Sequence, residues 1–253
     1  VKEVFHLTNR GVEGFVRSIF QMMKINLPVP DHTTVSTRGK NLKVNLPKKA
    51  NQKLNIVMDS TGLKIYGEGE WKVRQHGVSK RRTWRKLHIG ANPEDGEIQA
   101  VILTENSVSD DAAVEVLLEQ IEQEIDKFAA DGAYDKRKVY DGLNAHSPGV
   151  KILIPPRNAK RARIWKHGNT KAERLKRDEN LRSIRKHGRK EWKKNSGYHI
   201  RSLSETAMFR LKTIFGDELS ARLLETQTTQ ALVRCAALNR MTHLGMPQSY
   251  KVA

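Results

Sequence analysis

The first fifty residues combine two short stretches of helical pattern. Residues 11–25 repeat apolar positions every three or four residues, as an amphipathic helix does. Pro28 and Pro30 interrupt this pattern, and Asp31 is a suitable N-cap for a second, more polar helix. Two helices with a short turn are consistent with a helix-turn-helix. An α-hairpin packed on the rest of the chain fits the same pattern equally well.

The middle of the chain consists of short apolar runs bounded by turn residues, which predicts β-strands. In chain order the predicted strands are 54–62, 83–92, 97–105, 126–135 and 149–156. The second and third are joined by the sequence PEDGE, a suitable hairpin turn.

Between the third and fourth strands, residues 109–125 (SDDAAVEVLLEQIEQEI) predict an amphipathic helix. Ser109, Asp110 and Asp111 would then be its capping residues. Strands, one helix and further strands together indicate an α/β layer architecture.

Near the C-terminus the helical pattern returns. A helix over 201–215 places Arg201, Glu205 and Lys212 within about 40° of one another. The opposite face would pack on the core through Leu203, Ala207, Leu211 and Ile214. A second, longer helical pattern follows and ends before Gly245.

The charge of the chain points to a polyanionic partner. Lys and Arg number 46 against 28 Asp and Glu, which gives a net charge of +18 and a pI of about 10.0. Nucleic acid is the leading candidate, with an ordinary basic protein as the alternative. Residues 157–194 hold sixteen of these cations and only four acids, so we expect an irregular or partly disordered basic insertion there.

Other features exclude whole classes of protein. The single cysteine, Cys235, rules out an intramolecular disulfide and a multi-cysteine zinc site. No apolar run reaches the length of a membrane span, and the start lacks a secretory pattern, so we expect a cytoplasmic location and no membrane partner. Because the sequence begins with Val1, we expect further residues upstream.

Three acids stand where metal chemistry would need them. Asp59 and Asp131 are each predicted at the end of a buried strand, and Glu205 is on the late helix. Ligands of open α/β sheets collect at the carboxyl ends of strands. Carboxylates suit two Mg²⁺ ions about 3.5–4 Å apart that act on a phosphoryl group. Each acid could instead be structural, as a turn residue or a surface ion pair, and Asp135 is a rival for Asp131.

These three segments, VMDSTG, ADGAYD and YHIRSLSETAMFRLK, resemble those of bacterial insertion-sequence transposases of the DDE class. The last segment matches the Y-x2-R-x3-E-x6-K motif of one subgroup at four positions: Tyr198, Arg201, Glu205 and Lys212. GEGEWKVRQHG, WRKLH, LIPPR and ALNRMTHLGMP also resemble that family, so the resemblance covers roughly residues 5–253.

The resemblance implies an RNase H-like mixed sheet flanked by helices at 51–253, with the basic insertion 157–194 between the second Asp and the Glu. Residues 1–50 would be a helical, helix-turn-helix-like DNA-binding region. Asp59, Asp131 and Glu205 would bind two Mg²⁺ ions, with Mn²⁺ as a substitute. Tyr198, Arg201 and Lys212 would contact DNA phosphates near the cut.

The implied reaction is hydrolysis at the end of the element to free a 3′-OH, followed by attack of that 3′-OH on target DNA. The partners would be double-stranded DNA, at the element ends and the target, and further copies of the chain in a homo-oligomer on that DNA. The location would be the bacterial cytoplasm, in association with the nucleoid.

Two further groups of residues are candidates for DNA contact. Residues 71–86 are predicted to form a basic hairpin that contacts DNA through Lys72, Arg74, Arg81, Arg82 and Arg85, with a solvated loop as the alternative. Trp165 or Trp192 could stack on an unpaired base, or could simply anchor the insertion.

Two other functions remain open from sequence. The first is an RNase H-like nuclease that cleaves DNA but does not join it. The second is a truncated, catalytically inactive DNA-binding repressor, which would bind DNA without metal and would not need the acids.

Overall fold

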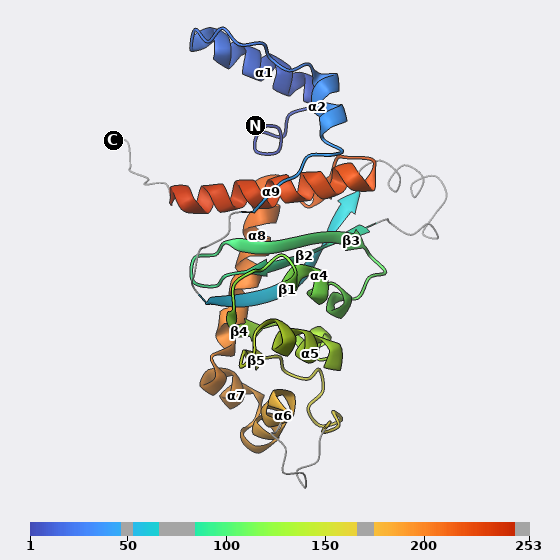
Figure 1. Ribbon diagram of the computed structural model, residues 1–253, viewed down its shortest axis with the longest axis vertical. Coiled ribbons are helices and arrows are strands. Elements are labelled where there is room, and N and C mark those ends of the chain that lie inside the picture. Colours follow the sequence, from blue (N-terminus) through green and yellow to red (C-terminus); the bar gives the residue numbers. More distant parts are fainter. Residues whose placement is uncertain (47–52, 66–83, 166–174, 246–253) are drawn as a thin grey trace.

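The computed structural model of the chain describes residues 1–46, 53–65, 84–165 and 175–245 (Figure 1). Its centre is a six-stranded sheet with the order β3-β2-β1-β4-β5, in which β6 pairs with β1 outside this path. The strands are β1 Leu54–Ile65, β2 Trp84–Ala91, β3 Ile98–Glu105, β4 Ile125–Ala129, β5 Lys151–Leu153 and β6 Glu218–Leu219.

The sheet is mixed. β1, β2 and β3 are antiparallel neighbours, whereas β4 and β6 run parallel to β1, and β5 runs parallel to β4. The predicted hairpin between β2 and β3 is confirmed, since Asn92 and Glu97 close its turn through a backbone hydrogen bond. A mixed sheet of this kind flanked by helices is the expected RNase H-like α/β fold.

Alternate residues of β1 face opposite layers of helices, as the two-residue period of a strand requires. Ile56 and Met58 pack in a core with α4 (Val114–Leu118) and α5 (Arg137–His146). Leu63 packs in a second core with α8 (Ser202–Phe215) and α9 (Leu224–Leu244). Asp59 has the parity of Leu63, so its side chain belongs to the α8 side of the sheet.

The predicted helix over 109–125 is wrong in length. The structure has a 3₁₀ turn, η1 (Asp110–Ala112), followed by the five-residue α4. The amide of Gln120 donates to the Val101 carbonyl and its side-chain oxygen accepts from the Val101 N–H. Gln120 thus satisfies the outer edge of β3 just where the helix stops, and the chain then enters β4.

The basic insertion is more ordered than its composition suggests. Its second half forms α6 (Lys176–His187) and α7 (Arg189–Ser196), and residues 166–174 lie outside the described residues. Leu181 and Ile184 of α6 are buried, and Arg177 makes two hydrogen bonds to the carboxylate of Asp135. The prediction of an irregular segment is therefore wrong for 175–194, because spaced apolar residues bury one face of this charged helix pair.

The two N-terminal helices are confirmed as α1 (Asn9–Met22) and α2 (His32–Arg38), the second capped by Asp31, which accepts from the Thr33 N–H. Figure 1 shows them at one end of the molecule, with α9 between them and the sheet. The segment before α1 is fixed to α9, because the Glu3 carboxylate accepts from Arg234 at 2.7 Å. Within the described residues, no helix combines the length and apolarity needed to cross a membrane.

Candidate active site

The pairing of β1 with β4 brings two of the predicted acids together. Val57 is opposite Ala129 in this parallel pair. Asp59 and Asp131 each follow two residues later, at the point where β4 has ended and no longer pairs with β1. Burial raises the pKa of Asp59 and the Arg201 guanidinium opposes this shift, while the nearby charge of Asp131 raises the pKa by a smaller amount.

The sequence pattern predicted that Asp59 ends its strand, and this prediction is wrong. β1 continues to Ile65, because β2 stays paired with it as far as Lys64. Asp59 therefore has a fixed extended backbone on both sides. Its Oδ1 accepts from the N–H of Ser60 at 2.9 Å, which orients the carboxylate.

Asp131 is held by a tight turn. Its Oδ1 accepts from the Ala133 N–H at 2.7 Å and caps the 3₁₀ turn η2 (Gly132–Tyr134). A Cβ atom on Gly132 would lie 2.9 Å from the carbonyl oxygen of Pro155 and 3.0 Å from the backbone nitrogen of Arg157. The Asp-Gly sequence is therefore needed for close approach to the LIPPR segment, which explains two of the motifs at once.

Glu205 is linked to Asp59 through Arg201. The Arg201 guanidinium donates to Glu205 Oε1 and, at 3.0 Å, to Asp59 Oδ2. Arg201 closes the 3₁₀ turn η3 (Tyr198–Arg201), and Glu205 lies one turn further on, in the first turn of α8. The Glu205 side chain is 59% exposed and can change rotamer without disturbing the core.

The buried face of α8 differs in phase from the prediction. Ala207 and Leu211 are buried as expected, but Leu203 is 39% exposed and Ser204 is buried in its place. The Ser204 hydroxyl lies 3.3 Å from Asp59 Oδ2 and donates to the Arg201 carbonyl at 2.7 Å. The buried stripe of α8 is completed by Met208 and Phe215, and in this rotation Ser204 faces Asp59.

Asp110 is a neighbour of this site that the sequence reading assigned to helix capping. Its side chain instead accepts from the Ser60 hydroxyl at 2.8 Å and lies 3.1 Å from Lys86 Nζ. Asp111, also predicted as a cap, pairs with Lys138. A cavity of about 430 Å³ opens here, and its lining includes Lys86, Asp110, Gly132, Lys136 and Arg157. The local sequence does not predict the contact between Ser60 and Asp110, because it depends on the fold.

Two predicted DNA contacts are buried instead. Trp192 is 3% exposed, its Nε1 donates to Asn180, and its ring packs at 5.3 Å on that of Tyr198, so it cannot stack on a base in this structure. Tyr198 is 6% exposed and its hydroxyl donates to the carbonyl of Ala130, beside Asp131. A direct phosphate contact by Tyr198 does not fit this arrangement, and burial raises its pKa to about 12.

Trp165 is also engaged within the protein. Its ring meets Tyr140 edge-on at 5.3 Å, and the Arg177 guanidinium lies 4.5 Å from its centroid. Both tryptophans thus anchor the insertion, the alternative that the sequence had left open.

The remaining candidates fall into two groups. Lys212 is partly exposed on α8, seven residues beyond Glu205. Arg85 is tied within the protein, because its Nε donates to Gln227 at 2.9 Å and its Nη1 lies 3.7 Å from Glu105. The predicted hairpin residues Lys72, Arg74, Arg81 and Arg82 lie outside the described residues.

The donor set fits a hard divalent cation. Asp59, Asp131 and Glu205 offer only carboxylate oxygens, which Mg²⁺ and Mn²⁺ prefer. The Arg201 guanidinium already lies between two of these acids, so a metal ion would bind there only after this side chain turns away. With Arg201 in that place, the three carboxylates are not gathered around a single point.

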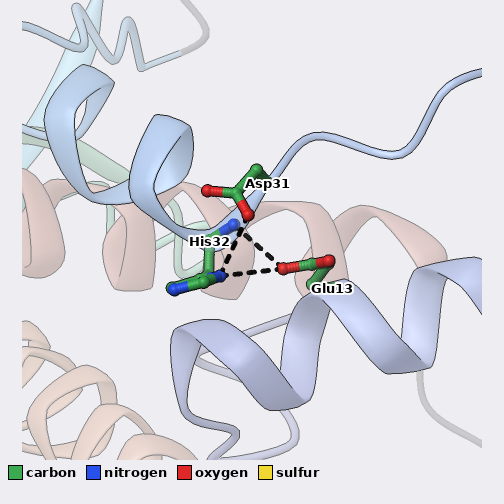
Figure 2. A group of neighbouring side chains, drawn as sticks. All are labelled: Glu13, Asp31 and His32. Atoms are coloured by element: carbon green, nitrogen blue, oxygen red, sulfur yellow. Dashed lines mark hydrogen bonds and ion pairs between the residues drawn. The ribbon is translucent and has the colours of Figure 1, made fainter.

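In the described part of the chain, the group of side chains that does meet such spacing is Glu13, Asp31 and His32, shown in Figure 2. It lies between α1 and α2, away from the sheet. His32 Nδ1 is 2.9 Å from Glu13 Oε2, the His32 N–H also donates to Glu13, and Asp31 Oδ1 caps α2. These hydrogen bonds hold α2 on α1, which gives the cluster a structural role without a metal ion.

A family model described as a transposase DDE domain matches residues 50–240, and a second model with the same description matches residues 1–68. The first match covers most of the chain, including β1, β4 and α8 with their three acids. The fold, the acids at the β1–β4 junction and this match agree: the chain belongs to the family of transposase DDE domains, whose substrate is DNA.

Proposed function

We propose that the chain cleaves DNA at the ends of a bacterial insertion sequence, frees a 3′-OH there, and joins this 3′-OH to target DNA. Asp59, Asp131 and Glu205 would be the metal ligands. The observation that carries the proposal is the register of β1 and β4, which aligns Asp59 with Asp131, together with the reach of Arg201 to both Asp59 and Glu205.

Two Mg²⁺ ions, or Mn²⁺ in their place, would activate the attacking oxygen and stabilise the leaving oxygen of an in-line displacement at phosphorus. Both proposed steps are such displacements, so one set of residues can serve both. Ser60 and Ser204 would keep the Asp59 carboxylate oriented, through the contacts to Oδ1 and Oδ2 described above. Gly132 would allow the turn that presents Asp131.

Arg201 would have two roles in turn. Without DNA its guanidinium neutralises Asp59 and Glu205, whose carboxylates would otherwise repel each other. With DNA bound it would turn to the scissile phosphate, where its planar fork can grip two oxygens. Lys212, on the same face of α8, would hold a neighbouring phosphate as a point charge.

The match to Y-x2-R-x3-E-x6-K supports membership of that subgroup, with a changed role for the tyrosine. Tyr198 would position the catalytic residues rather than contact DNA. Its hydroxyl ties η3, which leads into α8, to the end of β4 beside Asp131. It would thus fix the distance between Glu205 and Asp131.

Affinity for DNA would come from the large excess of Lys and Arg, and residues 1–50 would form a separate helical region that binds the element ends. Residues 51–253 would be the catalytic domain. Two or more copies would act together on paired DNA ends.

The test is a strand-transfer assay with the full chain and DNA from the borders of its own gene. Pre-nicked ends, a supercoiled target plasmid and Mg²⁺ should give joined products whose junctions map to the nicked 3′-OH. A parallel sample holds uncut border DNA, where cleavage without joining would indicate a nuclease instead. Metal-independent binding without any chemistry would indicate a repressor.

A further inference from the structure

Tyr134 is a deeply buried polar side chain beside Asp131, one of the three acids. It is three residues after Asp131 in η2, and a 3₁₀ turn has about three residues per turn, so the two side chains share a face. Its ring belongs to the core beneath α4 and α5 and is 1% exposed. Among the described residues its hydroxyl has no hydrogen-bond partner.

Charged groups from four parts of the chain act on this hydroxyl. Asp110 of η1, Asp59 of β1 and Asp131 before η2 raise the pKa of Tyr134, after burial as the main cause, while Arg201 opposes them. The phenol therefore stays protonated at any working pH and can donate a hydrogen bond. An unpartnered buried hydroxyl costs about 1–3 kcal/mol, so a well-ordered site is expected to supply an acceptor.

We propose that Tyr134 is a positioning residue whose hydroxyl is held for an acceptor that arrives with the divalent cation, an oxygen of the hydrated ion or of a carboxylate turned toward it. This inference rests on the proposed metal-dependent function. Tyr134 would orient that oxygen, and Asp110 would keep the site negative from the side of Ser60. Nothing else in η2 can do this, because the only other side chain of the turn is that of Ala133.

The test compares Tyr134→Phe with Tyr140→Phe in the DNA-free full chain. Tyr140 is a matched control: it is also buried, but its hydroxyl contacts the Ile154 carbonyl at 3.4 Å and Asp135 at 3.5 Å. In EDTA, Tyr134→Phe should raise the melting temperature or leave it unchanged, because it removes an unpartnered buried hydroxyl and no bond is lost. Tyr140→Phe should lower it.

In Mn²⁺ binding, Tyr134→Phe should be the affected variant and Tyr140→Phe the unaffected one. Titration calorimetry should show affinity reduced about three- to tenfold in Tyr134→Phe and unchanged in Tyr140→Phe. Wild-type Mn²⁺ affinity in Tyr134→Phe would overturn the inference, as would a lower melting temperature of this variant in EDTA, since the hydroxyl would then be partnered without the ion. Asp59→Asn tests the metal site itself, because it should abolish Mn²⁺ binding. If the wild type does not bind Mn²⁺, or if Asp59→Asn binds it equally well, the proposed metal site is wrong and not only the role of Tyr134.

Discussion

Arg201 Nη2 lies 3.0 Å from Asp59 Oδ2, across 142 residues of sequence. The same guanidinium also contacts Glu205, and its Nε is buried without a partner among the described residues. One cation thus joins a strand acid to a helix acid at the place proposed for metal binding. This arrangement, together with the turns around it, leads to several measurable consequences.

Replacing Arg201 should separate chemistry from affinity. Arg201→Gln should reduce single-turnover cleavage of a pre-bound, uncut border end by about 10²-fold, because the scissile phosphate loses its orientation. Arg201→Lys should also be damaging, since an ammonium does not reproduce the planar fork. DNA affinity by gel shift should change less than about twofold.

Lys190, exposed on α7, provides the control for Arg201. Lys190→Gln should weaken binding to all DNA slightly, with a smaller salt dependence, and should leave the cleavage rate of bound DNA unaltered. If Arg201→Gln lost affinity in proportion to rate, Arg201 would be an ordinary backbone contact.

Gly132 should tolerate no side chain. Gly132→Ala would push the turn away from Pro155 and Arg157, with an expected loss of stability of about 1–3 kcal/mol and a displaced Asp131. Gly142→Ala is the matched change, since a Cβ in α5 would have its nearest neighbour at 3.9 Å. It should raise stability by about 0.5–1 kcal/mol. Equal effects of the two variants on urea midpoints would contradict the close packing at Gly132.

His88 should make the fold sensitive to mild acid. Its imidazole is fully buried, with Nε2 2.9 Å from Thr104 Oγ1, and burial lowers its pKa from 6.5 to about 4. Lys86 lowers this pKa further, while Asp110 opposes the shift. Between those two values the unfolded chain binds a proton that the folded chain does not. The free energy of unfolding should therefore fall by about 3 kcal/mol as pH decreases from 7 to 4.

His88→Gln removes the imidazole that binds this proton in the unfolded chain, and the glutamine can keep a hydrogen bond to Thr104. Urea unfolding of the two proteins at pH 7, 6, 5 and 4 should show a shallower loss in the variant. Parallel curves would mean that other groups cause the acid sensitivity.

Trp192 should behave as a core residue. Trp192→Ala should cost about 3–5 kcal/mol of stability, because the ring fills the space between α6, α7 and Tyr198. Trp192→Phe should be milder and should bind DNA with frayed ends as well as the wild type does. A selective loss of affinity for unpaired ends in Trp192→Phe would restore the base-stacking role.

The sequence was sufficient for β1 to β5, the β2–β3 hairpin and the late helix, because each follows from local periodicity and turn residues. It missed β6, whose two residues belonged to the predicted helical pattern before α9. It could not show that Val57 pairs with Ala129, since register depends on long-range packing. It placed Leu203 inward on hydrophobicity, whereas α8 buries Met208 and Phe215 and turns Ser204 toward Asp59. Composition also misled for 175–194, where a few apolar residues and Trp192 outweigh many charges.

Asp110 and Tyr134 were missed for a related reason. Each is unremarkable in its local sequence, and each gains its environment only when β1, η1 and η2 meet. Pairs such as Ser60 with Asp110 are fifty residues apart and leave no periodic signal.

The most direct test of the account is strand transfer by Asp59→Asn, Asp131→Asn and Glu205→Gln. Asp111→Asn is the control, because the Asp111 carboxylate pairs with Lys138. Pre-nicked border DNA, target plasmid and Mg²⁺ are mixed with each protein, and joined products and DNA binding are measured in the same samples. The account predicts that each of the three changes abolishes joining with little loss of binding, while Asp111→Asn joins DNA like the wild type. Wild-type joining by any of the three variants would contradict the proposed metal site.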